Sequence, residues 1–225
     1  MMKSLIILPA IFISFICHAQ NWFSENNQGD KMPGYVLGMA GDTIQGFIKY
    51  DYPIIMQKRI SFYPTDETSK PIIYSPENIW GFSVANKKWI SATVIMETYD
   101  GQYTFKRFGI LQKDQGALML LRIFNERDKL KKNVNSAEAE KDLKNIDLNY
   151  PDNSIDQLYI KKTDGEAESL TSKAFKKSFL TKMRSYVGDN KNLLKKIESK
   201  EYSLKDIFRI TEEYNQWAAS AINNN

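Results

Sequence analysis

The chain is almost devoid of cysteine and histidine: among 225 residues it has one of each, Cys17 and His18, side by side near the N-terminus. The residues before them form a basic start and an apolar run, which is too short for a membrane anchor of about 20 residues. The small residues Cys17 and Ala19 complete the pattern of a secretory signal peptide spanning 1–19. We expect cleavage after Ala19, so that the mature chain begins at Gln20 and retains neither thiol nor imidazole.

Cys17 also raises the alternative of a lipoprotein signal, which is cleaved before a cysteine that is then acylated. That processing requires small residues just before the cysteine, where this chain has Phe15 and Ile16. The sequence therefore favours the ordinary leader and an exported protein, which is periplasmic, outer-membrane-associated or extracellular.

Loss of the only thiol and the only imidazole excludes several chemistries from the mature chain. A cysteine nucleophile, a Ser-His-Asp triad, a Cys/His zinc site and a disulfide all become impossible. The formal net charge of +4 is small and does not by itself indicate a nucleic-acid partner. We expect no catalytic residues, no cofactor, no metal site and no nucleic-acid binding.

Glycan chemistry is the alternative that these absences leave open, because two carboxylates can cleave a glycosidic bond without histidine. No spacing pairs the acidic residues near the expected strands, which are Glu97, Asp100, Asp114 and Glu126. Aromatic side chains that could stack on a sugar or another ligand are Trp80, Trp89 and Tyr103. Aromatic residues on strands more often pack half-buried, so a carbohydrate-binding protein or a His-independent glycan hydrolase is the second interpretation.

Short apolar runs separated by turn residues dominate 31–170, a pattern typical of a mostly antiparallel β module. Gly41-Asp42, Asp100-Gly101 and Asp164-Gly165 are hairpin turn signals. Two-residue turns there would pair Met39 with Ile44, Leu37 with Gly46, Tyr35 with Ile48, Met96 with Phe105, Thr98 with Tyr103, Glu97 with Thr104, and Lys161 with Glu168. The apolar run 116–124 is expected to be a buried strand, and the whole module a sandwich or partly open barrel.

Several of these elements resemble an uncharacterised family of exported Bacteroidota proteins marked by a GDTxxGxI hairpin motif. The similarity covers about 34–170 and lies in the stretches Gly34-Tyr35-Val36, Gly41-Asp42-Thr43-Ile44-Gln45-Gly46-Phe47-Ile48, Ile60-Ser61-Phe62 and Tyr74-Ser75-Pro76-Glu77-Asn78-Ile79-Trp80-Gly81-Phe82. The resemblance implies an envelope or secreted location and a β architecture, and it carries no catalytic residues.

The remaining segments have different compositions. Residues 20–30 are expected to be a flexible N-terminal segment, and about 125–154 a charged, mobile excursion from the sheet. From 171 to 225 the apolar residues recur at three- and four-residue steps, which predicts two or three amphipathic helices. Ser172 is the expected first N-cap, Gly188 the stop of that helix, and Ser203 with Asp206 a capping box.

This helical tail is also basic, with many lysines and few acids between 173 and 200. Such a run is usually a solvated face, but it can also attract anionic lipid head groups or acidic glycans. The residues that we expect at an anionic membrane surface are Lys173, Lys176, Lys177 and Arg184. The sequence thus predicts an α+β, non-catalytic envelope or secreted interaction module, whose partner is an unknown envelope protein or glycan.

Overall fold

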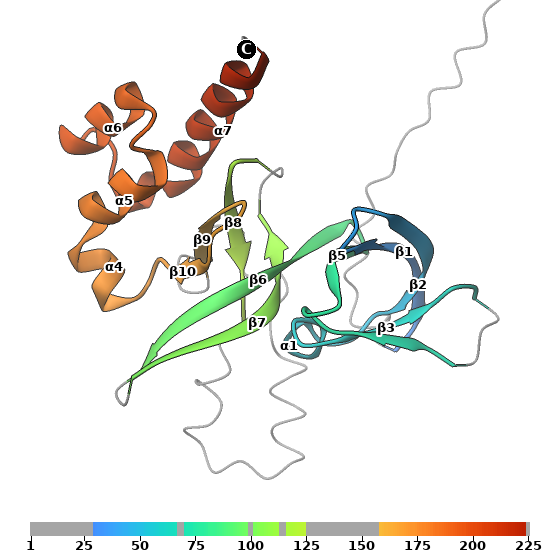
Figure 1. Ribbon diagram of the computed structural model, residues 1–225. Helices are drawn as coiled ribbons and strands as arrows, with labels where there is room; N and C mark the ends of the chain where they lie inside the picture. The colour runs from blue at the N-terminus through green and yellow to red at the C-terminus, as the bar shows by residue number, and fades with distance from the viewer. Residues whose placement is uncertain (1–28, 67–69, 99–100, 113–115, 125–157, 224–225) are drawn as a thin grey trace, which may run out of the picture.

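The computed structural model describes residues 29–66, 70–98, 101–112, 116–124 and 158–223. Its strands are β1 (Lys31–Gly38), β2 (Thr43–Lys49), β3 (Ile60–Tyr63), β4 (Ile72–Tyr74), β5 (Ile79–Val84), β6 (Lys87–Thr98), β7 (Gly101–Leu111), β8 (Leu118–Arg122), β9 (Leu158–Lys162) and β10 (Ala167–Ser169). Its helices are α1 (Pro53–Met56), α4 (Lys173–Lys177), α5 (Phe179–Val187), α6 (Lys191–Glu198), the 3₁₀ helix η3 (Leu204–Asp206) and α7 (Ile207–Asn223). The expected α+β class is confirmed, with the main helices following the strands (Figure 1). The expected leader 1–19, the charged excursion 125–154 and all but the last residues of 20–30 lie outside the described residues.

The ten described strands form one sheet in the order β10-β9-β8-β7-β6-β5-β1-β2-β3-β4. Neighbours in this order run antiparallel. β10 also pairs with β6 in parallel, through Ala167 with Val94 and Glu168 with Ile95, so β6 to β10 close into a ring. The other strands continue from β6 as a curled sheet that ends at β4 (Figure 1).

The hairpin of β6 and β7 is shared by two apolar cores, one on each of its faces. Trp89 pairs with Ile110, and both belong to the core of the curled sheet, together with Val36, Ile48 and other buried residues. On the opposite face Ile90 belongs to a second core. Leu121 of β8, Ile123 just after β8, Tyr159 of β9 and Ala167 of β10 complete it. Alternation along β6 and β7 therefore holds the two halves of the sheet together.

The helical tail covers the outer face of β8 and β9. Leu118, Leu120, Leu158 and Ile160 from these strands form a third core with residues of α4 to α7. Figure 1 shows α4 to α7 gathered on the β8–β9 side of the molecule, away from β1 to β3. The amphipathic stripes of the tail therefore pack on the β module.

The register predicted for the first hairpin is wrong. Leu37 pairs with Thr43 and Val36 with Ile44, because the loop has four residues. Gly41 has φ 87° and donates its N–H to the carbonyl of Gly38, so the turn lies earlier than the sequence indicates. The shift of three residues flips the face of β1, and Val36 rather than Leu37 reaches the core.

The other two predicted registers are also wrong, by smaller amounts. Met96 pairs with Tyr103, Thr98 with Gly101 and Glu97 with Gln102, a shift of two residues that keeps the same faces. In the third hairpin Glu168 pairs with Ile160 instead of Lys161. The N–H of Gly165 bonds to the carbonyl of Lys162, which makes this turn longer than two residues.

The predicted helix ends are confirmed. Ser172 accepts a hydrogen bond from the backbone N–H of Phe175, and Gly188 ends α5. Ser203 and Asp206 form the expected capping box at η3, which leads into α7. The expected single helix after Ser172 is divided at Ser178 into α4 and α5, where the Ser178 hydroxyl bonds to the carbonyl of Ala174.

Candidate functional site

The described residues offer little of the chemistry that a catalytic or metal site requires. Among them, no group of three or more His, Cys, Asp or Glu side chains could hold a metal ion. The side chains of the four carboxylates considered for glycan hydrolysis lie outside the described part of the chain; they are Glu97, Asp100, Asp114 and Glu126. Glycan hydrolysis through them stays a prediction.

The three aromatic residues expected to stack on a ligand do not form one platform. Trp89 is 2% exposed and its ring stacks on Phe82, so the prediction of ligand stacking is wrong for this residue. Trp80 is half-buried and packs against the core inside the ring of strands. Tyr103 is 49% exposed near the outer end of the β6–β7 hairpin.

Strand register keeps Trp80 and Tyr103 well apart. Gly81, next to Trp80, pairs with Ile90, whereas Tyr103 pairs with Met96. The six residues of β6 between 90 and 96 span about 20 Å at roughly 3.3 Å per residue. The rings of Trp80 and Tyr103 therefore do not flank a single sugar.

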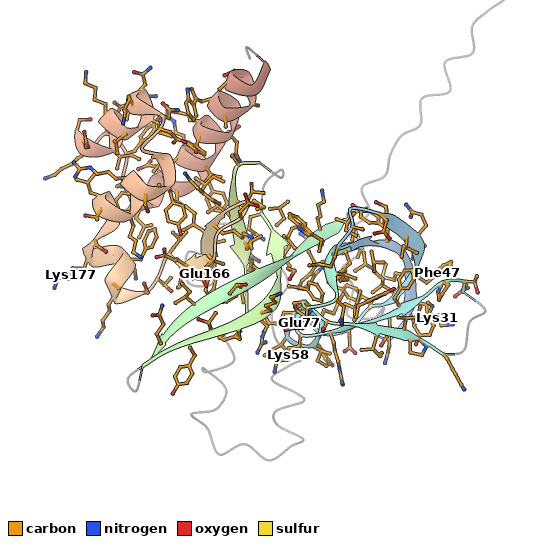
Figure 2. All side chains as sticks on the ribbon, in the orientation of Figure 1. Lys31, Phe47, Lys58, Glu77, Glu166 and Lys177 are labelled. Atoms are coloured by element: carbon orange, nitrogen blue, oxygen red, sulfur yellow. The ribbon has the colours of Figure 1, made fainter. Side chains whose placement is uncertain are left out.

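A different surface, on the helical tail, has a concentrated chemical character. The cap at Ser172 starts α4, and Phe175, 1% exposed, fixes this short helix in the core beside the strands. Lys173, Lys176 and Lys177 are then left on the exposed side of α4. Figure 2 shows Lys177 at the outer side of α4, directed away from the strands. We call Lys173, Lys176 and Lys177 the basic face.

The neighbouring cations of the tail have acidic partners. Lys182 Nζ lies 2.5 Å from Glu168 Oε2. Arg184 donates to Glu198 Oε1 through its Nε at 3.0 Å and its Nη2 at 2.6 Å. Arg184, expected at an anionic surface, is thus already ion-paired within the chain.

The ammonium groups of the basic face differ from these two neighbouring cations. Within the part of the chain that the structure describes, no ion pair or hydrogen bond joins Lys173, Lys176 or Lys177 to an acidic side chain. Three like charges within five residues leave a local excess that the described residues do not neutralise. A lysine acts as a point charge, so such an excess attracts anions with little geometric selectivity.

A second cluster of charges in the tail is structural. Tyr202 donates its hydroxyl hydrogen to Glu213 Oε1 at 2.5 Å, and Lys196 donates to Glu213 Oε2 at 2.9 Å. Burial of Glu213 would raise its pKa, but the hydrogen bonds from Tyr202 and Lys196 outweigh that effect and lower the pKa. Arg209 adds a longer contact to Glu213 and lies over the Tyr202 ring. This cluster joins α6 to α7 and pairs the Glu213 carboxylate with both cations.

One apolar residue beside the basic face escaped the sequence analysis. Leu180 is 37% exposed in the first turn of α5, three residues after Lys177 at the end of α4. The helical stripe runs through Phe175, Phe179 and later residues and leaves Leu180 outside it. An aliphatic residue off the apolar stripe and next to lysines is the signal that could have found it.

Comparison with known proteins yields no identification: no family model matches the chain, and neither does any curated protein or solved structure. The resemblance to an exported Bacteroidota family therefore stays a prediction. Of the described helices, none is long and apolar enough to cross a membrane.

Proposed function

We propose that the protein is a non-catalytic exported module that binds a polyanionic component of the cell envelope through the basic face. The observation that carries this proposal is the clustering of three exposed lysines, Lys173, Lys176 and Lys177, within five residues on α4. Among the described residues none of the three contacts a carboxylate, whereas the next two cations along the chain, Lys182 and Arg184, are paired with Glu168 and Glu198.

The electrostatics set the strength of such binding. Each lysine near an anionic surface contributes about 1 kcal/mol, so three contribute about 3 kcal/mol at moderate salt. Binding of this kind is weak and reversible for one molecule, and it weakens as salt screens the charges. The protein would associate with a polyanion that is abundant at its location, such as the envelope surface.

Export is the second half of the proposal and comes from the sequence. The leader 1–19 would direct the chain out of the cytoplasm, and its removal would leave a mature chain without thiol or imidazole. A chain of that composition is suited to binding through surface charge rather than to nucleophilic catalysis. Mass spectrometry of the mature protein tests this half, because the proposal requires Gln20 at its N-terminus.

Retention on immobilised dextran sulfate across a salt gradient tests the binding half. We expect the triple variant Lys173→Gln, Lys176→Gln, Lys177→Gln to elute at clearly lower salt than the unaltered protein. The matched control neutralises three other exposed lysines of the tail, Lys195, Lys200 and Lys205, and so changes the net charge equally. Equal loss of retention in both triple variants would show that net charge, not the basic face, governs binding.

A further inference from the structure

We infer that the polyanion bound by the basic face is the anionic surface of a lipid bilayer, and that Leu180 enters the head-group region when the protein docks. This inference rests on the proposed function, since it uses the same lysines. It adds the class of partner and an apolar contact that a soluble polyanion does not require.

The position of Leu180 carries the inference. Lys176 and Lys177 precede it by four and three residues, on the other side of the break between α4 and α5 at Ser178. The break is short, because the same residue, Ser178, donates its N–H to the Ala174 carbonyl and accepts from the N–H of Lys182. The exposed leucine therefore adjoins the lysines instead of lying on a separate surface.

The helical turn that carries Leu180 is packed against the core on its opposite side. Phe175 is buried, and Phe179 packs against the same core with its ring centroid 6.3 Å from that of Phe175. These two rings hold α4 and the start of α5 on the β module. Leu180 is thus held in an exposed position by the packing of its neighbours.

The chemistry of this surface favours a bilayer over an acidic glycan. Sugar recognition uses aromatic rings and polar groups in fixed geometry, and the forked guanidinium of Arg184 is already occupied by Glu198. Lysine ammonium groups follow lipid phosphates without fixed geometry, and an aliphatic side chain among them is buried at the boundary between head groups and acyl chains. An amphipathic surface of basic and aliphatic residues is the usual arrangement for docking on a bilayer.

Vesicle sedimentation separates this partner from a soluble polyanion. The unaltered protein should sediment with vesicles of phosphatidylcholine and phosphatidylglycerol, but not with vesicles of phosphatidylcholine alone. Leu180→Asn should weaken binding to the anionic vesicles roughly tenfold and leave retention on dextran sulfate unchanged. The control Met39→Asn alters another exposed apolar residue, 59% exposed in the β1–β2 loop, and should change neither measurement.

A dye at position 180 gives an independent readout. In a Cys17→Ala background, Leu180→Cys provides the single thiol of the chain for an environment-sensitive dye. Its emission should shift to the blue on anionic vesicles and stay unchanged with dextran sulfate, whereas a dye at Gln216→Cys should not respond to either. Vesicle binding that is indifferent to Leu180→Asn, with no spectral shift at 180, overturns the bilayer inference. Absence of binding to vesicles and to dextran sulfate alike overturns the proposed function itself.

Discussion

At the scale of single residues, two side-chain amides complete the hydrogen bonding of the β8 segment. Asn215 accepts from the Leu118 N–H and donates to the Leu118 carbonyl, both at 2.8 Å. Gln57, which is fully buried, makes the equivalent pair with the backbone of Phe124 at 2.9 and 3.1 Å. Each amide supplies the donor and the acceptor that a neighbouring strand would provide, so backbone groups at both ends of this buried segment are satisfied.

Lys161 is a buried charged residue whose position lowers the stability of the fold. It is 6% exposed and shares a face of β9 with Tyr159, which belongs to the core inside the ring of strands. Burial lowers the pKa of Lys161, and the nearby charge of Asp164 offsets this only in part. The ammonium group therefore loses hydration without a full ionic replacement.

This burial gives stability a defined dependence on pH. Because the folded-state pKa of Lys161 is lowered, the unfolded chain binds more protons between that pKa and about 10.4, the usual value for lysine. Stability should rise with pH through this window. Below the folded-state pKa both states are protonated, and the full cost of the buried charge remains.

Lys161→Met should therefore stabilise the protein at neutral pH. The midpoint of thermal unfolding is expected to rise by roughly 2–4 °C, the shift that about 1 kcal/mol produces in a protein of this size. The rise of stability with alkaline pH should also become shallower than in the unaltered protein. Lys205→Met, at an exposed position, serves as the control and should change neither property. A lower unfolding midpoint for Lys161→Met would show that the ammonium group has a stabilising partner.

At the scale of elements, local chemistry made some features predictable and left others open. The caps at Ser172 and Ser203 were predictable because a helix end is satisfied by residues within four positions. The hairpin registers were not predictable, because a Gly-Asp pair indicates a turn but does not define which residues form the centre of that turn. In the first hairpin this ambiguity moved the register by three residues, so that Leu37 pairs with Thr43 instead of Gly46.

The candidate site was predictable only in part, for a related reason. The sequence places Lys173, Lys176, Lys177 and Arg184 on one basic tail without showing their partners. Glu198 neutralises Arg184, and Glu168 from β10 neutralises Lys182, through contacts that bring distant parts of the chain together. Which lysines remain unpaired is thus a property of the tertiary fold.

Close approach of two strands makes Gly109 necessary in β7. A Cβ atom at this position would lie 2.9 Å from Leu121 Cβ and 3.0 Å from Ile123 Cγ1, both in the core inside the ring. Gly109→Ala should therefore lower the free energy of unfolding by about 1–3 kcal/mol, the usual cost of overpacking. Chemical denaturation measures this loss.

Gly165→Ala is the matched control for that substitution. Its Cβ would meet nothing closer than 3.6 Å, and the position is an exposed turn. We expect a change within about 0.5 kcal/mol, as for most surface substitutions. Equal losses at the two glycines would indicate a general cost of replacing glycine rather than contact with Leu121 and Ile123.

At the scale of the whole molecule, the helical tail and the sheet share one apolar core. The third core takes Leu118 and Ile160 from strands and Met183 and Ile210 from helices, so neither part buries these side chains alone. Tyr186 extends its hydroxyl from α5 to the carbonyl of Ile160. Removal of the tail would expose aliphatic residues of β8 and β9, and we therefore expect a single unfolding transition for strands and helices together.

Asn215 of α7, which hydrogen-bonds to the backbone of Leu118 in β8, provides a test of whether the tail and the sheet unfold together. Gly116 leaves room for it, since a Cβ atom there would fall 2.4 Å from Asn215 Cγ. Asn215→Ala should leave the N–H and carbonyl of Leu118 without these bonds and reduce stability by about 1–3 kcal/mol. Far-ultraviolet signals of helix and near-ultraviolet signals of the aromatic core should still change together, at a lower denaturant concentration, and the Leu118 amide should exchange faster. The control Gln216→Ala, at the exposed neighbouring position, should leave the two spectroscopic transitions and the exchange of the Leu118 amide unchanged.

If the helices of the Asn215→Ala protein melted before the sheet, the tail would be a separate unit resting on the β module, because only independent units lose structure in separate steps.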